Sequence, residues 1–578
     1  MKREYIVTLK SKNDLKFFYE DMETSGGSQY IPNREVELKD RRAISRNTHY
    51  LLTEEEAAEI RKDGRVLEVE LTPKERGLNP TLFGSYIVSG NFDKTPDAGS
   101  DINWGILHCA GNQSQRGKGV FGQGQTEQVT DSVTVFNDGE NVDIVIVDEP
   151  VAYDHQEFLD PDTNQTRFVQ YQWYSELDQY MVSLDTQESD ITYQNFINSN
   201  TDLPYYNCSQ LDGYSLDHGT HVAGTAAGKV QGWARKSNIY SIAVDIGEVV
   251  QAIGQQNTME DTKVFDYLRA FHLNKSVNPT TGKINPTVTN HSWGYSYQIV
   301  ISDLSQLSTI NYRGTTFNYN ASTWNENYIE SQFGFQILPY GSLKVILIPL
   351  RQTWLDVDVE DAIEDGVIVV SAAGNNYSFC SNDTNHQDYN NRVFFTRSGS
   401  QILQVNGTDY NNGDAYYNQG SSPGRASGTI NVGSISQYSD FRKADYSDYG
   451  NTIDILAPGS NILSSVPNSN SSFSYKSGTS MAAPQVTGIV ACFCTNRDGR
   501  EVNNSRALQY LQDMGIDEEI TEDVYGGGVS DTTSLRDTPN LTAASRERRE
   551  EYPILSFNDF PRKSEGVMYP RKKIGKKS

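Results

Sequence analysis

Four short apolar runs between residues 142 and 375 most constrain the fold of this chain. They read VDIVIVD (142–148), SNIYSIAVD (237–245), PTVTNHSWG (286–294) and DGVIVVSAAGN (365–375). Runs of this kind are typical of strands buried on both faces, as in a parallel sheet covered by helices. Functional residues of such sheets collect beyond the carboxyl ends of the strands. Three runs end there in polar residues, Asp148, Ser292 and Asn375, so we expect a site at this edge.

A serine stands at the expected start of a helix in SYKSGTSMAAPQVTGIV (474–490). Gly478 and Thr479 permit a tight turn, the small residues that follow favour a helix, and Pro484 is tolerated near a helix start, where N–H groups lack intrahelical partners. Ser480 would then lie at the positive end of the helix dipole, which favours an oxygen nucleophile and the oxyanion that it creates. A buried capping serine is the alternative, unless the chain supplies a base.

Two histidines three residues apart, His218 and His221, precede a small-residue helix in LDHGTHVAGTAAG (216–228). An H-x-x-H pair could be half of a metal site. No nearby third ligand stands out among the eight histidines, and the Gly and Thr between the pair suit a helix start. We therefore leave the metal ligands unknown.

The chain resembles the subtilisin-like serine proteases, the subtilases of peptidase family S8. The resemblance rests on VDIVIVD with Asp148, DHGTHVAGT with His218, VVSAAGN with Asn375 and SGTSMAAP with Ser480, in the order of that family. Weaker matches are NWGIL (103–107), NHSWG, GTINVGSI (428–435) and ILAPG (455–459). The match covers roughly residues 104 to 540 and implies a doubly wound, mostly parallel α/β sheet.

The resemblance implies a serine endopeptidase, a hydrolase made as a zymogen, with Asp148, His218 and Ser480 as its catalytic triad. A serine hydroxyl needs an imidazole to accept its proton and a carboxylate to orient the imidazole. The Ser480 N–H and the Asn375 amide would then stabilise the oxyanion. Protein or peptide substrates are expected and no cofactor is required, although structural calcium is compatible with the family. The rival is a catalytically silent relative with a binding or assembly role.

Substrate contacts follow from the same resemblance. Ser292, Trp293 and Gly294 would lie on the edge strand that pairs with extended substrate. The first specificity pocket would be lined by Ala372, Ala373 and Gly374. None of these residues is charged, so we expect a preference for neutral or apolar side chains.

Two segments depart from the family pattern. Asp148 is followed by Glu149 and Pro150, where the family usually has a small residue or Asp and then Gly. Proline cannot adopt the positive φ open to glycine, so this turn must differ in shape. In PQVTG (484–488), Gln485 replaces the more common His, and we expect a change of packing only.

The first 71 residues predict a small ferredoxin-like α+β domain. Strands are expected at 4–9, 34–38, 46–52 and 66–71, one helix at 13–22, and a second helix opened by a capping box of Thr53 and Glu56. This β-α-β-β-α-β unit resembles the family's pro-domain, an intramolecular inhibitor. We therefore divide the chain into a pro-domain (1–78), a linker (79–103) and a catalytic domain (104–540). Self-cleavage is expected within 72–103, and a permanently attached domain is the alternative.

Two long segments rich in Asn, Tyr and Ser, near 296–350 and 377–427, indicate surface insertions in the catalytic domain. Residues 541–578 form a charged, basic tail, which is either a tether to an acidic partner or a disordered solubilising segment. The fragment DPDTNQT (160–166) carries acidic residues at alternate positions but lacks the Gly and Glu of an EF-hand, so we expect a hairpin turn rather than a calcium loop.

Charge and cysteine content limit the classes of function. The chain has 49 basic and 75 acidic residues, a formal net charge of −26, which disfavours nucleic acid and anionic membranes as partners. The five cysteines are sparse and odd in number, so reduced thiols are expected rather than a disulfide scaffold or a zinc site. No signal peptide and no apolar run of about 18 residues is found. We expect no membrane association and a cytoplasmic location by default, with association with a particle or non-classical export as alternatives.

Overall fold

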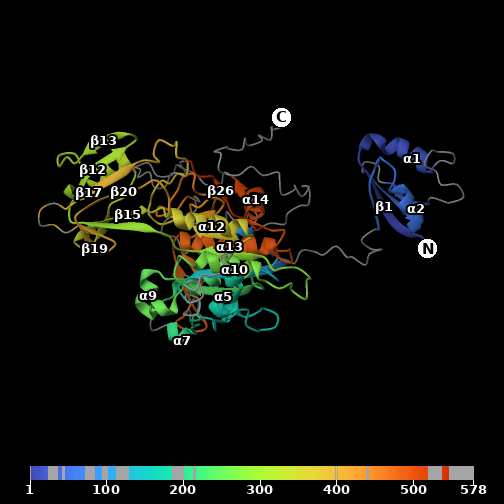
Figure 1. The fold of residues 1–578 in the computed structure, drawn as a ribbon, viewed down its shortest axis with the longest axis horizontal. Helices are drawn as coiled ribbons and strands as arrows, with labels where there is room; N and C mark the ends of the chain where they lie inside the picture. Colours follow the sequence, from blue (N-terminus) through green and yellow to red (C-terminus); the bar gives the residue numbers. More distant parts are fainter. Residues whose placement is uncertain are drawn as a thin grey trace. The chain divides into compact units, whose positions relative to one another are not determined.

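The computed structural model of the chain describes residues 2–23, 37–41, 46–71, 85–93, 102–111, 129–184, 201–211, 216–397, 399, 401, 403–437, 442–517 and 537–545. The chain divides into two compact units, Met1–Phe83 and Gly84–Ser578, which are described separately (Figure 1). No helix within the described residues is long and apolar enough to cross a membrane.

The first unit has the expected β-α-β-β-α-β order. Its antiparallel sheet runs β2-β3-β1-β4, and the elements are β1 (Arg3–Leu9), α1 (Leu15–Glu23), β2 (Glu37–Arg41), β3 (Asn47–Leu52), α2 (Glu54–Ile60) and β4 (Val66–Leu71). Alternate residues of β1 are buried against both helices, because side chains along a strand point to opposite faces. The capping box is confirmed: Thr53 Oγ1 accepts the Glu56 N–H, and Glu56 Oε2 accepts the Thr53 N–H.

The segment predicted as a linker, 79–103, contains a strand in its middle part. Strand β5 (Ser85–Asp93) pairs antiparallel with β7 (Val129–Phe136) in the second unit, from Ser85 opposite Phe136 to Phe92 opposite Val129. A short parallel strand, β6 (Ile102–Asn103), completes this sheet. Polar residues and Gly90 break the apolar alternation of β5, and its partner strand lies some 40 residues later. The local sequence pattern therefore did not predict this strand.

The second unit is built on an eight-stranded sheet in the order β25-β26-β22-β21-β16-β10-β8-β9. The four apolar runs form β8 (Asp143–Asp148), β9 (Asn238–Ala243), β10 (Thr287–His291) and β16 (Ile368–Ala372), and the sheet continues with β21 (Ile430–Ile435), β22 (Ile455–Pro458), β26 (Leu541–Thr542) and β25 (Ile516–Asp517). All neighbours pair in parallel except β25 and β26. The predicted parallel sheet is therefore confirmed.

Helices cover both faces of this sheet, as a doubly wound fold requires. Ile144 and Ile146 of β8 face one core with α8 (His218–Ala227) and α13 (Thr479–Cys494). Val145 and Val147 face a second core with helices from the other side of the sheet, namely α5 (Trp173–Leu184), α10 (Val264–Leu273) and α12 (Thr353–Glu364). Strands buried on both faces must be apolar throughout, which explains the runs that the sequence shows.

Shorter elements complete the second unit. They are the helices α3 (Trp104–Ala110), α7 (Cys208–Leu211), α9 (Gly247–Ile253) and α14 (Asn504–Met514), and the hairpin strands β23 (Ile462–Val466) and β24 (Ser472–Lys476). All five cysteines are buried as free thiols, as expected.

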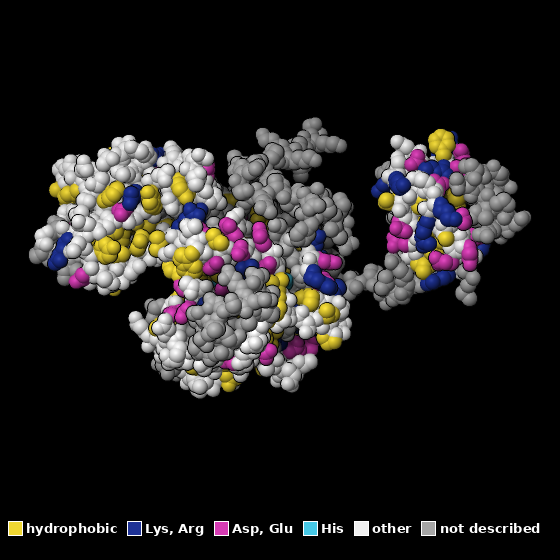
Figure 2. All heavy atoms as spheres, in the orientation of Figure 1, with side chains coloured by type: hydrophobic (Ala, Val, Ile, Leu, Met, Phe, Trp, Pro, Cys, Tyr) yellow, Lys and Arg dark blue, Asp and Glu magenta, His cyan; other side chains and the backbone are white. Residues whose placement is uncertain are grey.

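The two predicted insertions fold together as one β-rich subdomain. The first contributes β11 (Ser296–Ile301), β12 (Leu307–Tyr312), β13 (Thr315–Asn318), α11 (Glu326–Phe333), β14 (Leu338–Tyr340) and β15 (Leu343–Pro349), and the second contributes β17 (Arg392–Thr396), β18 (Leu403–Val405), β19 (Thr408–Tyr410) and β20 (Asn412–Tyr416). Their strands mix in two sheets, β14-β15-β11-β18-β19 and β13-β12-β17-β20, around one shared core. Apolar and basic side chains are scattered over the face of this subdomain seen in Figure 2.

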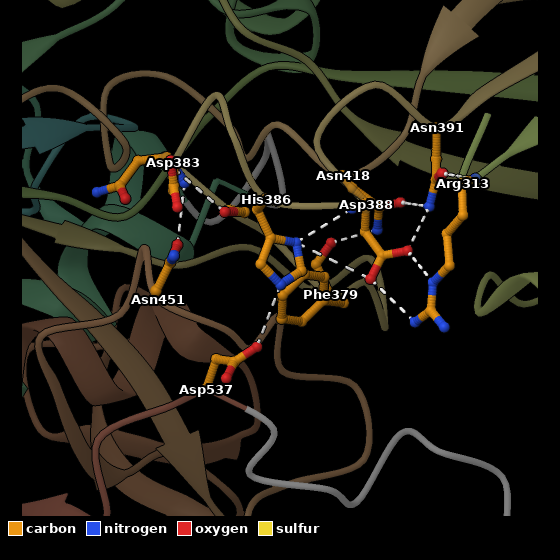
Figure 3. Close-up of polar contacts among 11 residues, drawn as sticks. Arg313, Phe379, Asp383, His386, Asp388, Asn391, Asn418, Asn451 and Asp537 are labelled. Carbon is orange, nitrogen blue, oxygen red and sulfur yellow. Dashed lines mark hydrogen bonds and ion pairs between the residues drawn. The ribbon is translucent and has the colours of Figure 1, made fainter. Parts of the chain in front are cut away.

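A polar cluster joins the inserted subdomain to the rest of the second unit (Figure 3). Arg313, in the turn between β12 and β13, donates to both carboxylate oxygens of the buried Asp388, at 2.7 and 3.1 Å. His386 lies beside Asp388 and places its Nε2 3.5 Å from Asp537, which belongs to the C-terminal segment. The Asn391 amide bridges Asp388 and Asn418. Side chains from three separate stretches therefore hold the subdomain in place.

The expected boundary between catalytic domain and tail at 540 is too early. Leu541 and Thr542 form β26 inside the main sheet, Ala543 donates its N–H to Leu456, and Ser545 donates its N–H to Cys109. Leu541, Ala543 and Ala544 are buried, so this segment belongs to the core. The remainder of the predicted basic tail lies outside the described residues.

Candidate active site

Asp148 and His218 are hydrogen-bonded at the carboxyl edge of the main sheet. Asp148 ends β8 and is 1% exposed, and its Oδ1 lies 2.7 Å from Nδ1 of His218, the first residue of α8. Burial lowers the pKa of His218, but the charge of Asp148, the hydrogen bond that His218 donates to Asp148 and the charge of Glu149 together raise it above its ordinary value. The imidazole is thereby fixed in orientation and stabilised in its charged form, as a general base requires.

Ser480 is the second residue of α13, as the sequence predicted. The loop before it is held by a hydrogen bond from the Gly478 N–H to Gly459. At this position the Ser480 N–H has no acceptor within the helix and points out of its N-terminus. In this structure the Ser480 hydroxyl donates to the Ser292 carbonyl oxygen at 3.0 Å.

The reason expected for Pro484 needs correction. Pro484 is the sixth residue of α13, beyond the first turn, where its missing N–H would otherwise serve the Ser480 carbonyl four residues earlier. The Ser292 hydroxyl replaces that donor, because its Oγ donates to the Ser480 carbonyl oxygen at 2.9 Å. Ser292 and Ser480 are therefore joined by two reciprocal hydrogen bonds, and the proline frees the carbonyl that one of them uses.

Asn375 presents its amide N–H₂ beside the start of α13. Its Oδ1 accepts both the N–H and the hydroxyl of Thr479, each at 2.9 Å, which fixes the orientation of the amide. A Cβ atom on Gly478 would lie 3.4 Å from Asn375 Nδ2 and 3.6 Å from Ser480 N, so the two donors flank the same space. Two converging donors of this kind can bind an oxyanion.

Asp448 supports this loop, and the sequence analysis did not identify it. Its carboxylate is fully buried and accepts the Asn376 N–H, the Asn376 amide and the Ser378 N–H at 2.9 to 3.0 Å. Burial raises the pKa of Asp448 to about 6, and these hydrogen bonds and Lys443 oppose the rise. A side chain on Gly374, whose φ is +111°, would collide with this carboxylate. Asp448 follows Asn375 by more than 70 residues, and no local sequence signal links the two.

The six predicted substrate residues lie at the same edge, with differing exposure. Ser292, Trp293 and Gly294 follow β10, and Trp293 packs against the core formed with α10 and α12. Ala372 and Ala373 are buried at the end of β16. Gly374 donates its N–H to Thr479 Oγ1 at 3.2 Å, next to Asn375. The structure therefore places Ser292 against Ser480 and Gly374 against Thr479, whereas Trp293 packs against the neighbouring core.

His221 and Gln485 are buried and make hydrogen bonds that hold the core together. His221 is buried, its Nε2 donates to the carbonyls of Ile462 and Ser474, and burial lowers its pKa to about 3. His221 therefore links α8 to the β23–β24 hairpin. Its Nε2 is used by these carbonyls, so it does not join His218 in the metal site that the H-x-x-H spacing allowed. Gln485 accepts the indole N–H of Trp233 at 2.6 Å, deep in the core.

The DPDTNQT fragment forms the predicted turn. Asp160 Oδ1 accepts the N–H groups of Asp162 and Thr163 and the Thr163 hydroxyl, and Asp162 is ion-paired with Lys236 at 2.7 Å. These carboxylates are occupied by their own turn and by a lysine, so they do not fit a calcium loop. The described residues hold no cluster of three metal-binding side chains of the His, Cys, Asp and Glu types.

A doubly wound sheet with an Asp–His pair and a helix-start serine on one edge has the arrangement of a serine-hydrolase site. The Peptidase_S8 model, described as the subtilase family, matches residues 139–513, which is more than half of the chain. The chain belongs to the subtilase family.

Similarity to individual relatives is moderate. The chain is 25% identical over 339 residues to the subtilisin-like serine protease pepC of Aspergillus niger, covering 59% of this chain and 44% of that protein. It is 24% identical over 367 residues to the subtilisin-like serine protease Pen c 2 of Penicillium citrinum, covering 64% and 58%. The chain thus spans about half the length of these relatives. A cold-adapted subtilisin-like serine proteinase of known structure matches 73% of this chain and 94% of its own, at 19% identity and a TM-score of 0.40.

Proposed function

We propose that this chain is a serine endopeptidase that uses Asp148, His218 and Ser480. The observation that carries the proposal is the 2.7 Å hydrogen bond between the buried Asp148 and His218, on the sheet edge where Ser480 lies in the first turn of α13. Membership of the subtilase family supports it. Neutral or apolar side chains of protein or peptide substrates fit the uncharged residues from Ser292 to Gly294 and from Ala372 to Gly374.

The reaction begins when Ser480 Oγ leaves the Ser292 carbonyl by rotation about χ1. Its proton passes to His218 Nε2 as Oγ forms a bond to the substrate carbonyl carbon, and Asp148 stabilises the resulting imidazolium. The oxyanion accepts hydrogen bonds from the Ser480 N–H and the Asn375 amide. His218 then gives its proton to the leaving amine, and a water molecule hydrolyses the acyl-enzyme by the same steps in reverse order.

We also propose that the chain cleaves itself ahead of β5. Residues 85–93 pair with β7 of the second unit, so a cut that keeps β5 in the same chain as β7 lies within 72–84, the first part of the window expected from the sequence. The first unit, Met1–Phe83, is compact by itself and would act as an intramolecular inhibitor after the cut. A tethered segment reaches Ser480 at a higher effective concentration than any external substrate.

Labelling with a fluorophosphonate probe tests the activity. The wild-type protein should label at Ser480 and hydrolyse peptides from a library, whereas the Ser480→Ala protein should do neither and His218→Ala should lose nearly as much activity. A folded protein that never labels, even after limited proteolysis removes the first unit, would favour a catalytically silent subtilase with a binding role.

Intact mass and N-terminal sequencing test the self-cleavage. A new N-terminus within 72–84 in the wild type, absent from the Ser480→Ala protein, is the expected result. Two full-length proteins would show that the first unit is a permanent domain.

A further inference from the structure

Glu149, the residue after the buried Asp148, has no part in the reaction proposed above. Its side chain is 9% exposed, and its Oε2 accepts the His218 backbone N–H at 2.7 Å. Its own N–H donates to Asp148 Oδ1, the same oxygen that faces His218 Nδ1. Glu149 therefore contacts both members of the Asp–His pair.

The Glu149 carboxylate supplies the N-terminal cap that α8 lacks in its own sequence. Asp217, the residue before His218, makes no side-chain capping bond and is ion-paired with Lys476 at 2.8 Å. A carboxylate that accepts a free N–H at the first turn stabilises a helix, because it meets the positive end of the helix dipole. Here this carboxylate comes from the loop after β8.

Close packing fixes this loop against the first turn of α8. A side chain on Gly219 would collide with the Glu149 carbonyl oxygen. The Ala152 N–H donates to Thr220 Oγ1 at 2.9 Å, and Pro150 restricts the backbone between these two contacts. The proline that departs from the family pattern therefore belongs to a loop that holds Glu149 in place.

We propose that Glu149 is a positioning residue for His218, fixing the start of α8 and adding a second negative charge beside the imidazole. The inference rests on the proposed function, in which His218 is the base. A second carboxylate stabilises the imidazolium that forms when Ser480 loses its proton.

The charged groups around Glu149 are Asp148 on β8, His218 and Asp217 at the start of α8, and Lys476 on β24. Burial, followed by the charge of Asp148, raises the pKa of Glu149 to about 7, and His218 opposes this rise. The charge of Glu149 in turn raises the pKa of His218, while Lys476 lowers it. The protonation of Glu149 and the protonation of His218 are therefore coupled.

Glu149→Gln removes the charge and keeps the cap, because the amide oxygen can still accept the His218 N–H. We expect the pKa of His218 to fall by about one unit when this charge is lost. The acidic limb of kcat/KM should move to lower pH by a similar amount, because the neutral imidazole is the active base.

Two measurements on the full-length chain test the inference. Histidine NMR in the Ser480→Ala protein gives the pKa of His218 without turnover, and the rate of fluorophosphonate labelling against pH gives the same ionisation in the active protein. Asp154→Asn is the matched control. Asp154 lies on the same loop and its carboxylate also accepts a backbone N–H, that of Cys208 at 2.7 Å, but it caps α7 rather than α8.

A fall in the His218 pKa with Glu149→Gln and none with Asp154→Asn supports the inference. An unchanged His218 pKa in Glu149→Gln refutes it and leaves Glu149 as a helix cap alone. If the Gln variant does not fold, Glu149→Asp is the second variant, because it keeps the negative charge on a shorter side chain. A His218 pKa that falls by about one unit in Glu149→Asp would also refute the inference. The His218 pKa could fall with Glu149→Gln in the Ser480→Ala protein while the protein that keeps Ser480 never labels. That result would uphold the role of Glu149 and reject the proposed function.

Discussion

The reciprocal hydrogen bonds between Ser292 and Ser480 predict an energetic coupling between Ser292 and Pro484. Pro484 has no N–H to offer the Ser480 carbonyl, and the Ser292 hydroxyl donates to that oxygen instead. In Ser292→Ala the carbonyl loses its donor. In the double variant with Pro484→Ala, the new N–H at position 484 can close the helical hydrogen bond, so the carbonyl is satisfied again.

The expected size follows from the cost of an unpaired carbonyl. Loss of the donor to a buried carbonyl destabilises by about 1–3 kcal/mol, and the part-buried Ser480 carbonyl falls toward the lower end of that range. Ser292→Ala also removes the acceptor for the Asn290 amide, which lies 2.9 Å from Ser292 Oγ. That second loss is the same in both backgrounds and cancels in the double-mutant cycle. We therefore expect Ser292→Ala to cost about 1 kcal/mol less in the Pro484→Ala background.

The assay is urea unfolding of the four proteins of the cycle, all carrying Ser480→Ala so that none can digest itself. This substitution keeps the Ser480 backbone carbonyl and removes its hydroxyl equally from every variant. Unchanged m-values are required, because they show that the same surface unfolds in each protein. A coupling energy below about 0.3 kcal/mol would lie within the usual error of additivity. It would refute the claim that the Ser292 hydroxyl takes the place of the N–H that Pro484 lacks.

Three further predictions concern other parts of the second unit. Asn375→Ala should lower kcat by about 10²–10³ with KM nearly unchanged, because its hydrogen bond strengthens only as the oxyanion forms; an equal loss confined to KM in steady-state peptide hydrolysis would contradict this role. The folded pKa of Glu149, about 7, lies above its unfolded value, so the stability that it contributes is present below about pH 4.5 and lost as pH rises through 7. The free energy of unfolding of Glu149→Gln should therefore exceed that of the wild type by up to about 3 kcal/mol at pH 8 and equal it at pH 4. A difference between the two proteins that does not change with pH would argue against the raised pKa of Glu149. Asp388→Asn should weaken the bidentate pair with Arg313 and destabilise the inserted subdomain by about 1–3 kcal/mol, seen as faster limited proteolysis within 296–416; cleavage at the wild-type rate would show that the pair adds no stability.

Local patterns were enough to predict the first four strands of the main sheet and the helix that starts beside Ser480. Ile144 to Val147 are apolar because both faces of β8 are covered. The uninterrupted apolar run in VDIVIVD is therefore enough to predict a buried strand. The place of Ser480 at the start of α13 follows likewise from the Gly-Thr pair and the small residues around it. The capping box of Thr53 and Glu56 spans only three residues, so it too was readable from the sequence.

Partners far apart in the sequence were decided by the tertiary structure alone. The co-folding of 296–349 with 392–416, the pairing of β5 with β7, and the return of 541–545 to the main sheet all depend on strand edges that no local pattern specifies. The same holds within the site. Ser292 meets the carbonyl freed by Pro484, Asp448 supports the Asn375 loop, and Glu149 caps α8 across a gap of 69 residues. The residue types needed for chemistry are thus set locally by the sequence. The buried polar groups that hold them find their partners only in the folded chain, because packing removes water and leaves protein groups as the available donors and acceptors.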